Sequence, residues 1–142
     1  YTMVAGGSPF EGKLEFQGKD NIAASDAGIY LLDVSLGWLS YKVTKVNNVS
    51  YTGLNDDWTF HAMTASADDP CVFTAEVEKT ANTPWGVKIC INESWDLFFG
   101  GNGTPGELCY GKDGFEGDND FENGTLILTV DLARGTYSYQ KK

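Results

Sequence analysis

The stretch DAGIYLLDVSLGWLSY at residues 26–41 decides the fold, because the chain uses it twice. Its second copy is ENGTLILTVDLARGTY at residues 122–137, which aligns with the first without a gap. The positions identical in both copies are Gly28, Leu32, Val34, Leu36 and Tyr41 in the first, and Gly124, Leu128, Val130, Leu132 and Tyr137 in the second. The likeness continues upstream, where GKLEFQGKD (12–20) resembles GELCYGKDG (106–114) once one residue is skipped. Such self-similarity indicates that one β supersecondary unit occurs twice.

Apolar and polar residues alternate with period two along much of the chain, which is the pattern of half-buried β-strands. The alternation predicts strands at 14–16, 29–36, 41–51 (long or bent), 58–62, 73–77, 87–92 and 125–132. Turn-forming residues cluster between them at 55–57, 68–70, 82–84, 100–103 and 123–124. About seven to nine strands with frequent turns predict an all-β fold, an antiparallel β-sandwich.

The repeat also bears on domain organisation. Residues 1–46 contain only the closing half of the repeated unit, whereas 47–140 contain a complete one. A segment as short as 1–46 buries little core by itself. We therefore expect residues 1–142 to form a single β-sandwich domain in which 1–46 supplies extra strands. The alternative is that 1–46 is the tail of a preceding domain.

The composition limits the classes of function. A net charge of −10 gives an acidic surface that repels phosphate groups, so we expect no binding to nucleic acid. No segment is apolar over the length needed to span a membrane. The three cysteines, Cys71, Cys90 and Cys109, do not have the spacing of zinc ligands. Their odd number favours buried free thiols, and a Cys90–Cys109 disulfide is the alternative.

The motifs of an enzyme are absent from the sequence. The single histidine, His61, lies between apolar residues in a predicted strand and is interpreted as structural, because a metal site needs several ligands. No serine has the surroundings of a nucleophile elbow. An acidic loop could hold Ca²⁺, but it lacks the spacing of a calcium loop and is interpreted as a solvated turn. Its residues are Asp113, Glu116, Asp118, Asn119, Asp120 and Glu122. We expect no enzyme activity, no metal and no cofactor.

The four tryptophans are more informative, because aromatic faces stack on the apolar faces of sugar rings. Trp38 lies in a predicted turn at the place where the second copy has Arg134, which predicts that Trp38 is exposed to solvent. Trp85 follows Pro84 at the entry to a predicted strand, where its side chain can point to either face of the sheet.

The other two tryptophans are predicted to point towards the core. Trp58 alternates with Phe60, and Trp95 shares parity with Leu97 and Phe99. Asp96 beside Trp95 would then point outward. This parity makes Trp95 the weakest of the aromatic candidates for ligand binding.

Three segments of the chain resemble one known family. They are YTGLNDDW (51–58), VFTAEVEKTANTPWGVKICINESWDLFFGG (72–101) and NGTLILTVDLARGTYSY (123–139). They resemble the repeated domains of starch-utilisation-type outer-membrane glycan-binding lipoproteins of Gram-negative bacteria. The matching positions are Gly53 with Trp58, Lys88 with Trp95 and Gly100-Gly101, and Gly124 with Val130-Asp131-Leu132 and Tyr137. Position 126 is Leu where the family strand often has Tyr.

The resemblance implies an immunoglobulin-like β-sandwich without enzyme activity that recognises an oligosaccharide or polysaccharide. It implies a place at the cell surface, in the outer membrane, as part of a longer lipid-anchored protein for polysaccharide utilisation. Neighbouring domains or an outer-membrane transporter complex are the protein partners that it implies.

The leading hypothesis is a non-catalytic carbohydrate-binding domain of a glycan-capture protein. The candidate glycan-binding residues are Trp38, Trp85 and Trp95, with Lys88, Asn92 and Asp96 as hydrogen-bonding partners. One alternative is a structural spacer or assembly domain without a ligand of its own. Another is a hydrolytic enzyme, which would need carboxylates that converge in a cleft.

Overall fold

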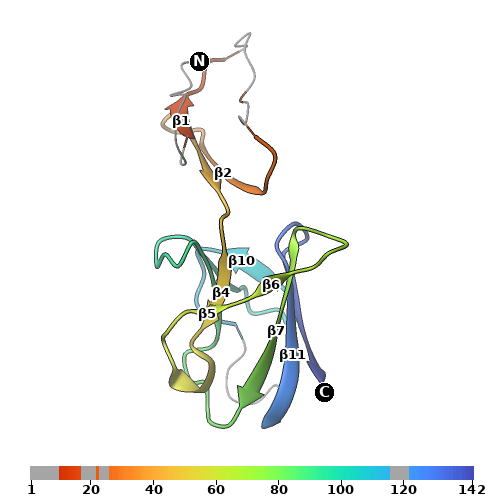
Figure 1. The fold of residues 1–142 in the computed structure, drawn as a ribbon. Helices are drawn as coiled ribbons and strands as arrows, with labels where there is room; N and C mark the ends of the chain where they lie inside the picture. Colours follow the sequence, from red (N-terminus) through yellow and green to blue (C-terminus); the bar gives the residue numbers. More distant parts are fainter. Residues whose placement is uncertain (1–9, 17–21, 23–25, 116–121) are drawn as a thin grey trace. The chain divides into compact units, whose positions relative to one another are not determined.

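The computed structural model describes residues 10–16, 22, 26–115 and 122–142, and these confirm the all-β prediction (Figure 1). The strands are β1 (Phe10–Lys13), β2 (Tyr30–Ser35), β3 (Ser40–Lys45), β4 (Val49–Thr52), β5 (His61–Ala62), β6 (Thr64–Ala65), β7 (Val72–Lys79), β8 (Lys88–Ile91), β9 (Phe98–Gly101), β10 (Leu108–Tyr110), β11 (Gly124–Asp131) and β12 (Thr136–Lys141). A short 3₁₀ turn, η1 (Leu54–Asp56), follows β4.

The chain divides into two compact units, Tyr1–Val46 (unit 1) and Asn47–Lys142 (unit 2). The division falls where the partial copy of the repeat gives way to the complete copy. That both units together form one sandwich domain stays a prediction. The strand predicted at 41–51 is in fact two strands, β3 and β4, which belong to different sheets. Val46, Asn47 and Asn48 separate them, since the chain leaves one sheet there and enters the next.

Unit 1 contains a three-stranded antiparallel sheet in the order β1-β3-β2. Tyr41 and Val43 of β3 are buried, and Leu14, Ile22 and Tyr30 pack against them. The first strand was predicted at 14–16, but β1 ends at Lys13. Alternation alone places a short strand poorly, because the end of pairing depends on the partner strand.

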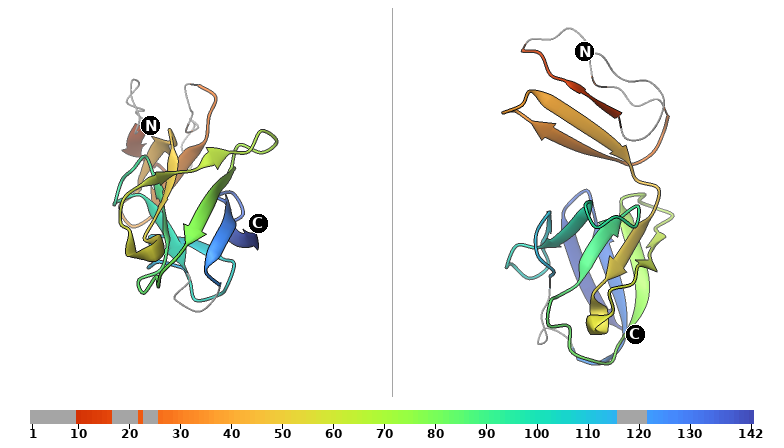
Figure 2. Two further views of the ribbon diagram at one scale, coloured as in Figure 1. Left: turned by 60° about the horizontal axis from the view of Figure 1, so that its bottom comes forward. Right: turned by 90° about the vertical axis from the view of Figure 1, so that its left-hand side faces the viewer.

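Unit 2 contains two antiparallel sheets that lie in two layers (Figure 2). The five-stranded sheet has the order β10-β9-β8-β4-β5, and the four-stranded sheet has the order β12-β11-β7-β6. Each contributes one apolar face to a common core. The residues with at most 1% of their surface exposed include Val49, Val87, Ile89 and Ile91 of the five-stranded side and Val77, Leu128 and Val130 of the four-stranded sheet. This is the packing of a β-sandwich, whose inner faces alternate with outward polar residues.

The repeat in the sequence is a repeat in structure. In unit 1, Val34 pairs with Tyr41 across the β2–β3 hairpin, and in unit 2, Val130 pairs with Tyr137 across the β11–β12 hairpin. These are the residues that the sequence alignment equates, so the two hairpins have the same register. A slip of one residue would turn every side chain to the opposite face, so equal registers give equal apolar faces.

The segment upstream of each hairpin is also placed alike. The Leu14 N–H donates to the Leu39 carbonyl at 2.7 Å in unit 1, and the Leu108 N–H donates to the Gly135 carbonyl at 2.8 Å in unit 2. The glycines upstream of the two hairpins also lie beside equivalent tyrosines. Gly12 pairs with Tyr41, and the Gly106 carbonyl accepts from the Tyr137 N–H at 3.0 Å. The residues just upstream of the hairpin are therefore placed alike in the two units, although β1 pairs with β3 in unit 1 and β10 pairs with β9 of the five-stranded sheet in unit 2.

The hairpin turns differ at one strained position. Leu39 has a φ of 48°, and the equivalent Gly135 has a φ of 65°. This left-handed region costs an L-residue about 1–2 kcal/mol and costs glycine little. Leu39 is half exposed, so its side chain recovers little of this cost by burial. The β2–β3 turn of unit 1 thus carries backbone strain that the equivalent β11–β12 turn of unit 2 avoids.

We predict that Leu39→Gly stabilises the β2–β3 hairpin. Relief of the strain should raise the free energy of opening by about 1 kcal/mol. Hydrogen exchange of the β3 amides measures this directly. Gly135→Leu is the matched reverse change and should weaken the β11–β12 hairpin. Faster exchange in Leu39→Gly than in the unmodified chain would contradict the strain argument.

Candidate functional site

The segment from Asp57 to Ala62 presents different chemistry on its two sides. Trp58 and Phe60 share one side with Ala62, whereas Asp57, Thr59 and His61 share the other, as the period of an extended chain dictates. Ala62 pairs with Ser50, which lies on the face of the five-stranded sheet opposite the core. Trp58 and Phe60 are therefore directed to the outer face of that sheet.

The polar side of this segment is held by a hydrogen-bonded network. Asp57 accepts hydrogen bonds from the Thr59 N–H at 3.0 Å and the Thr59 hydroxyl at 2.8 Å, and its other oxygen is 2.9 Å from His61 Nε2. The His61 ring stacks on Tyr51, with ring centroids 5.0 Å apart. The bonds from Thr59, and then the contact with His61, lower the pKa of Asp57 from 3.8 to about 2. The network fixes the backbone from which the two aromatic side chains project.

The loop that precedes this segment is tied to the rest of unit 2. Asn55 is the main tether: its Oδ1 accepts from the N–H groups of Thr80 and Ala81, and its Nδ2 donates to the Glu78 carbonyl at 2.7 Å. At Gly53 the φ is 90°, and a Cβ would lie 2.5 Å from the Gly86 carbonyl oxygen, so only glycine fits. The G-x-x-D-D-W stretch of the sequence is thus a fixed loop that positions Trp58.

Trp95 joins the two aromatic residues from a different part of the chain. It lies in the turn between β8 and β9, where its ring centroid is 4.8 Å from that of Phe60 and 6.3 Å from that of Trp58. We call Trp58, Phe60 and Trp95 the aromatic patch. Tilted aromatic pairs of this kind add about 0.5–1.5 kcal/mol beyond the burial of their area. The Trp58 indole N–H donates to Asp56 Oδ1 at 2.9 Å, which fixes the orientation of that ring.

Three residues on the outer face of the five-stranded sheet are buried although they point away from the core. Ser50, Thr52 and Cys90 lie on the outer face of the five-stranded sheet, yet at most 1% of the surface of each is exposed. Burial raises the pKa of the Cys90 thiol to about 11. We infer that the large side chains of the patch cover this face, since polar residues of a sheet's outer face are ordinarily solvated.

The outer face also carries a positively charged side chain, that of Lys88. Lys88 pairs with Thr52 on this face, and its Nζ lies 4.4 Å from the ring centroid of Phe98. The face thus carries half-exposed aromatic rings with a carboxylate (Asp56) and an ammonium group near them.

The structure assigns different surroundings to the residues predicted from the sequence. The exposed fraction is 82% for Trp38, 72% for Trp85, 48% for Trp95 and 36% for Trp58. The predicted exposure of Trp38 is confirmed. The predicted inward orientation of Trp58 and Trp95 is wrong, because parity fixes which residues share a face but not which face meets the core.

The remaining candidates fall into two groups. Lys88 lies on the outer face with the aromatic patch, and Asp96 is exposed beside Trp95. Asn92 has a structural role, since its Oδ1 accepts from the Asn47 N–H at 2.7 Å. Among the described residues no aromatic ring stacks on Trp38 or Trp85. Trp58 and Phe60 are the site residues that the sequence analysis missed, and the alternation of 58, 60 and 62 was the signal for them.

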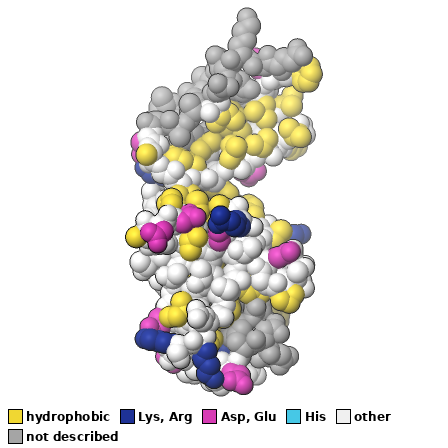
Figure 3. Space-filling model, turned by 90° about the vertical axis from the view of Figure 1, so that its right-hand side faces the viewer, with side chains coloured by type: hydrophobic (Ala, Val, Ile, Leu, Met, Phe, Trp, Pro, Cys, Tyr) yellow, Lys and Arg dark blue, Asp and Glu magenta, His cyan; other side chains and the backbone are white. Residues whose placement is uncertain are grey.

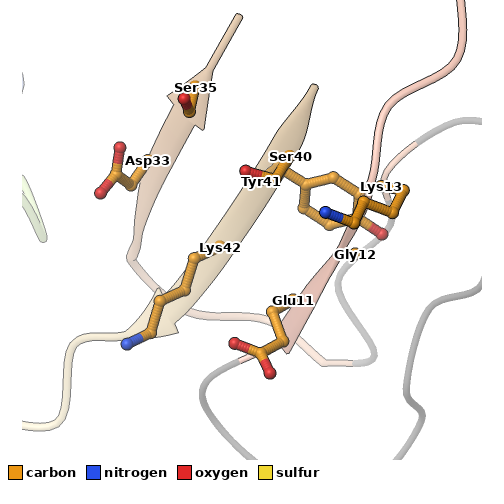
Figure 4. A pocket seen from close by; sticks show the side chains of 8 residues that line it. All are labelled: Glu11, Gly12, Lys13, Asp33, Ser35, Ser40, Tyr41 and Lys42. Atoms are coloured by element: carbon orange, nitrogen blue, oxygen red, sulfur yellow. The ribbon is translucent and has the colours of Figure 1, made fainter. Parts of the chain in front are cut away.

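Unit 1 has a hollow of about 540 Å³ that is lined by residues of all three strands, among them four charged residues and Tyr41 (Figure 4). Glu11, Lys42 and Asp33 cross it from three neighbouring strands, and opposite charges in such a row stabilise the sheet. Trp38 belongs to the turn whose flanking residues line the hollow. This alternation of charge accounts for the hollow without a ligand.

Within the described part of the chain, no group of three or more histidine, cysteine, aspartate or glutamate side chains is placed to hold a metal ion. Of the acidic loop, Glu116, Asp118, Asn119 and Asp120 lie outside the described residues. All three cysteines are free, as the sequence favoured, but only Cys90 is buried; the predicted burial is wrong for Cys71 and Cys109, which are partly exposed. No helix in the described residues has the length and apolar character needed to cross a membrane.

Comparison with known proteins yields one match. Residues 1–45 match a family described as a domain of unknown function, DUF8037, and the match is confined to unit 1. No curated protein and no solved structure is similar to the chain.

We predict that the segment carrying Trp58 loosens in acid. The pKa of Asp57 is depressed in the folded state, so its contribution to stability is present above pH 4 and is lost as the pH falls towards 2. Tryptophan emission between pH 5 and pH 2 should change with this titration. Asp57→Asn should remove that change, while Asp56→Asn, which leaves the network intact, should preserve it. An unchanged acid transition in Asp57→Asn would contradict the assignment.

We also predict that Cys90 reports the integrity of the aromatic patch. Cys71 and Cys109 are partly exposed and should react with a thiol reagent, while Cys90 should not. Trp95→Ala should make Cys90 reactive because it uncovers the outer face, and Trp85→Ala should not. Mass spectrometry of labelled peptides identifies the thiol. An unreactive Cys90 in Trp95→Ala would show that Trp95 does not cover it.

Proposed function

We propose that the chain is a non-catalytic carbohydrate-binding segment and that the aromatic patch of unit 2 holds the glycan. The observation that carries the proposal is the exposed outer face of the five-stranded sheet, where Trp58 and Trp95 lie 6.3 Å apart. Aromatic faces of this kind offer apolar contact area at low entropic cost, because their side chains have few rotatable bonds. Sugar rings carry apolar faces edged by hydroxyl groups, which match such a surface.

The polar groups around the aromatic patch suit the hydroxyl groups of a sugar. Asp56 already accepts from the Trp58 indole and retains a second oxygen that can accept from a ligand. Asp96 is exposed next to Trp95, and Lys88 supplies a donor on the same outer face. The aromatic rings supply contact area for the sugar, and these polar groups fix the orientation of the sugar.

The resemblance to outer-membrane glycan-binding lipoproteins extends this proposal. It adds an immunoglobulin-like arrangement of strands, a position at the cell surface and a role in polysaccharide utilisation as part of a longer lipid-anchored protein. Such a protein would present the aromatic patch to a polysaccharide outside the cell and pass it to neighbouring domains or a transporter complex.

The alternative function is a spacer or assembly domain, and the observation that favours it lies in unit 1. The hydrophobic side chains of Leu32 and Val34 are exposed there, which is typical of a surface that contacts another protein segment. This function and glycan binding are compatible, because they use different units.

We predict that the patch tryptophans determine glycan affinity. Calorimetric titration with soluble α-glucan, β-glucan, mannan and mucin-type oligosaccharides should give a dissociation constant roughly in the micromolar to millimolar range for one class. Trp58→Ala removes a ring contact and should weaken that binding by about tenfold, which corresponds to about 1.4 kcal/mol. Trp95→Phe replaces the indole by a smaller ring and should weaken the binding less than Trp58→Ala does. Trp95→Phe keeps the outer face covered, so its effect reports stacking rather than unfolding.

Trp85→Ala and Trp38→Ala serve as matched controls, because both remove an exposed tryptophan elsewhere. They should leave the affinity within about twofold, a difference of less than about 0.5 kcal/mol. Loss of binding in either control with full binding in Trp58→Ala would move the site away from the aromatic patch. No heat of binding with any of the four glycan classes would favour the spacer function.

A further inference from the structure

Unit 1 exposes an apolar face that its counterpart in unit 2 buries. Leu32 and Val34 of β2 are 53% and 43% exposed. The equivalent residues of β11, Leu128 and Val130, have no exposed surface. Hydrophobic side chains gather on unit 1 in the space-filling view (Figure 3). The same hairpin, in the same register, is thus covered in one unit and uncovered in the other.

The edge of the sheet shows the same difference. In unit 2, β11 lies between β12 and β7, and it pairs with β7 over its full length from Gly124 to Asp131. In unit 1, the described residues give β2 a single partner, β3. The free edge of β2 corresponds to the edge of β11 that receives β7. An exposed strand edge next to an exposed apolar face is a place where another strand can pair.

These two independent differences have one explanation. In unit 2 the apolar face of the hairpin is covered by the five-stranded sheet, and its edge is filled by β7. The strands β4 to β9 supply the edge partner and most of the covering sheet. All of them precede the closing segment 106–142 in the chain. Unit 1 has the equivalent of that closing segment but no equivalent of β4 to β9 among its described residues.

We propose that unit 1 is the closing segment of a second β-sandwich, and that β2 and its apolar face dock a strand segment of the same polypeptide that lies N-terminal to Tyr1. The occupant resembles 49–101 of unit 2: one strand pairs antiparallel with β2, and a sheet covers Leu32 and Val34. In unit 2 the residues opposite Leu128 and Val130 are Ala75 and Phe73 of β7. The docking strand therefore carries apolar residues at alternate positions.

In unit 2 the covering strands precede the closing segment, and this order favours a preceding segment as the occupant over a second copy of the chain. A second copy would bring its own closing segment, which lacks the strands that cover this face in unit 2. Unit 2 already uses the inner faces of both its sheets, where Val49, Ile89 and Leu128 are buried. A preceding segment with the strand content of 49–101 supplies both the edge partner and the covering sheet.

The test compares the 142-residue chain with a longer polypeptide in which the N-terminal segment required by this proposal precedes Tyr1. Val34→Cys is introduced into both, in a Cys71→Ser, Cys109→Ser background, and maleimide labelling is followed over a range of protein concentrations. We expect fast labelling in the 142-residue chain and labelling slower by about tenfold or more in the longer one, as the docked face opens only transiently. Trp38→Cys is the control, because the equivalent Arg134 side chain is 70% exposed in the complete unit. It should label rapidly in both proteins.

Hydrogen exchange of β2 supplies a readout that does not depend on the substitution. The outward amides of β2 should exchange rapidly in the 142-residue chain and be protected in the longer polypeptide. Equal labelling of the Val34→Cys variants, together with equal exchange of β2 in the two proteins, would overturn the proposal. So would protection in the 142-residue chain itself: concentration-dependent protection would identify a second copy as the occupant, and protection at all dilutions would identify unit 2.

Discussion

The burial of the apolar face of β11 beneath the five-stranded sheet is the interaction on which unit 2 depends. Leu126, Leu128 and Val130 are almost completely removed from solvent there. Full burial of each such side chain contributes about 1.5–3 kcal/mol, which is large beside the stability of a small domain. Because the inner face of the five-stranded sheet is fixed by this contact, its outer face becomes a rigid platform. Trp58, Phe60 and Trp95 are displayed on that platform.

The same hairpin in unit 1 shows that a local sequence does not determine its own surroundings. The register of the hairpin and the hydrogen bond that joins the upstream segment to its turn are alike in both copies, because they depend on contacts within about thirty residues of chain, the range of one supersecondary unit. The covering sheet comes from strands further away, and unit 1 lacks them among its described residues. One closing segment therefore occurs in two settings, and the difference between them identifies the exposed face as an interface.

The sequence predicted the all-β class, the repeated unit and the loops at 55–57, 68–70 and 82–84, since period-two alternation and turn residues are local signals. It did not predict which side of the 58–62 segment meets the core. Alternation assigns Trp58, Phe60 and Ala62 to one face, but the choice of face depends on the pairing of Ala62 with Ser50. Trp95 could not be connected to Phe60 from the sequence, because the contact joins two turns far apart in the chain. The break at 46–48 was missed since β-branched residues continue on both sides of it.

The central claim is that the aromatic patch, and no other tryptophan, meets the glycan. The four indole N–H groups give separate signals in a ¹⁵N–¹H correlation spectrum, so titration with a bound oligosaccharide tests all four tryptophans at once. We predict that the signals of Trp58 and Trp95 shift together along one binding isotherm while those of Trp38 and Trp85 stay in place. Shifts confined to Trp38 or Trp85 would contradict this account, as would four unchanged signals across all glycan classes.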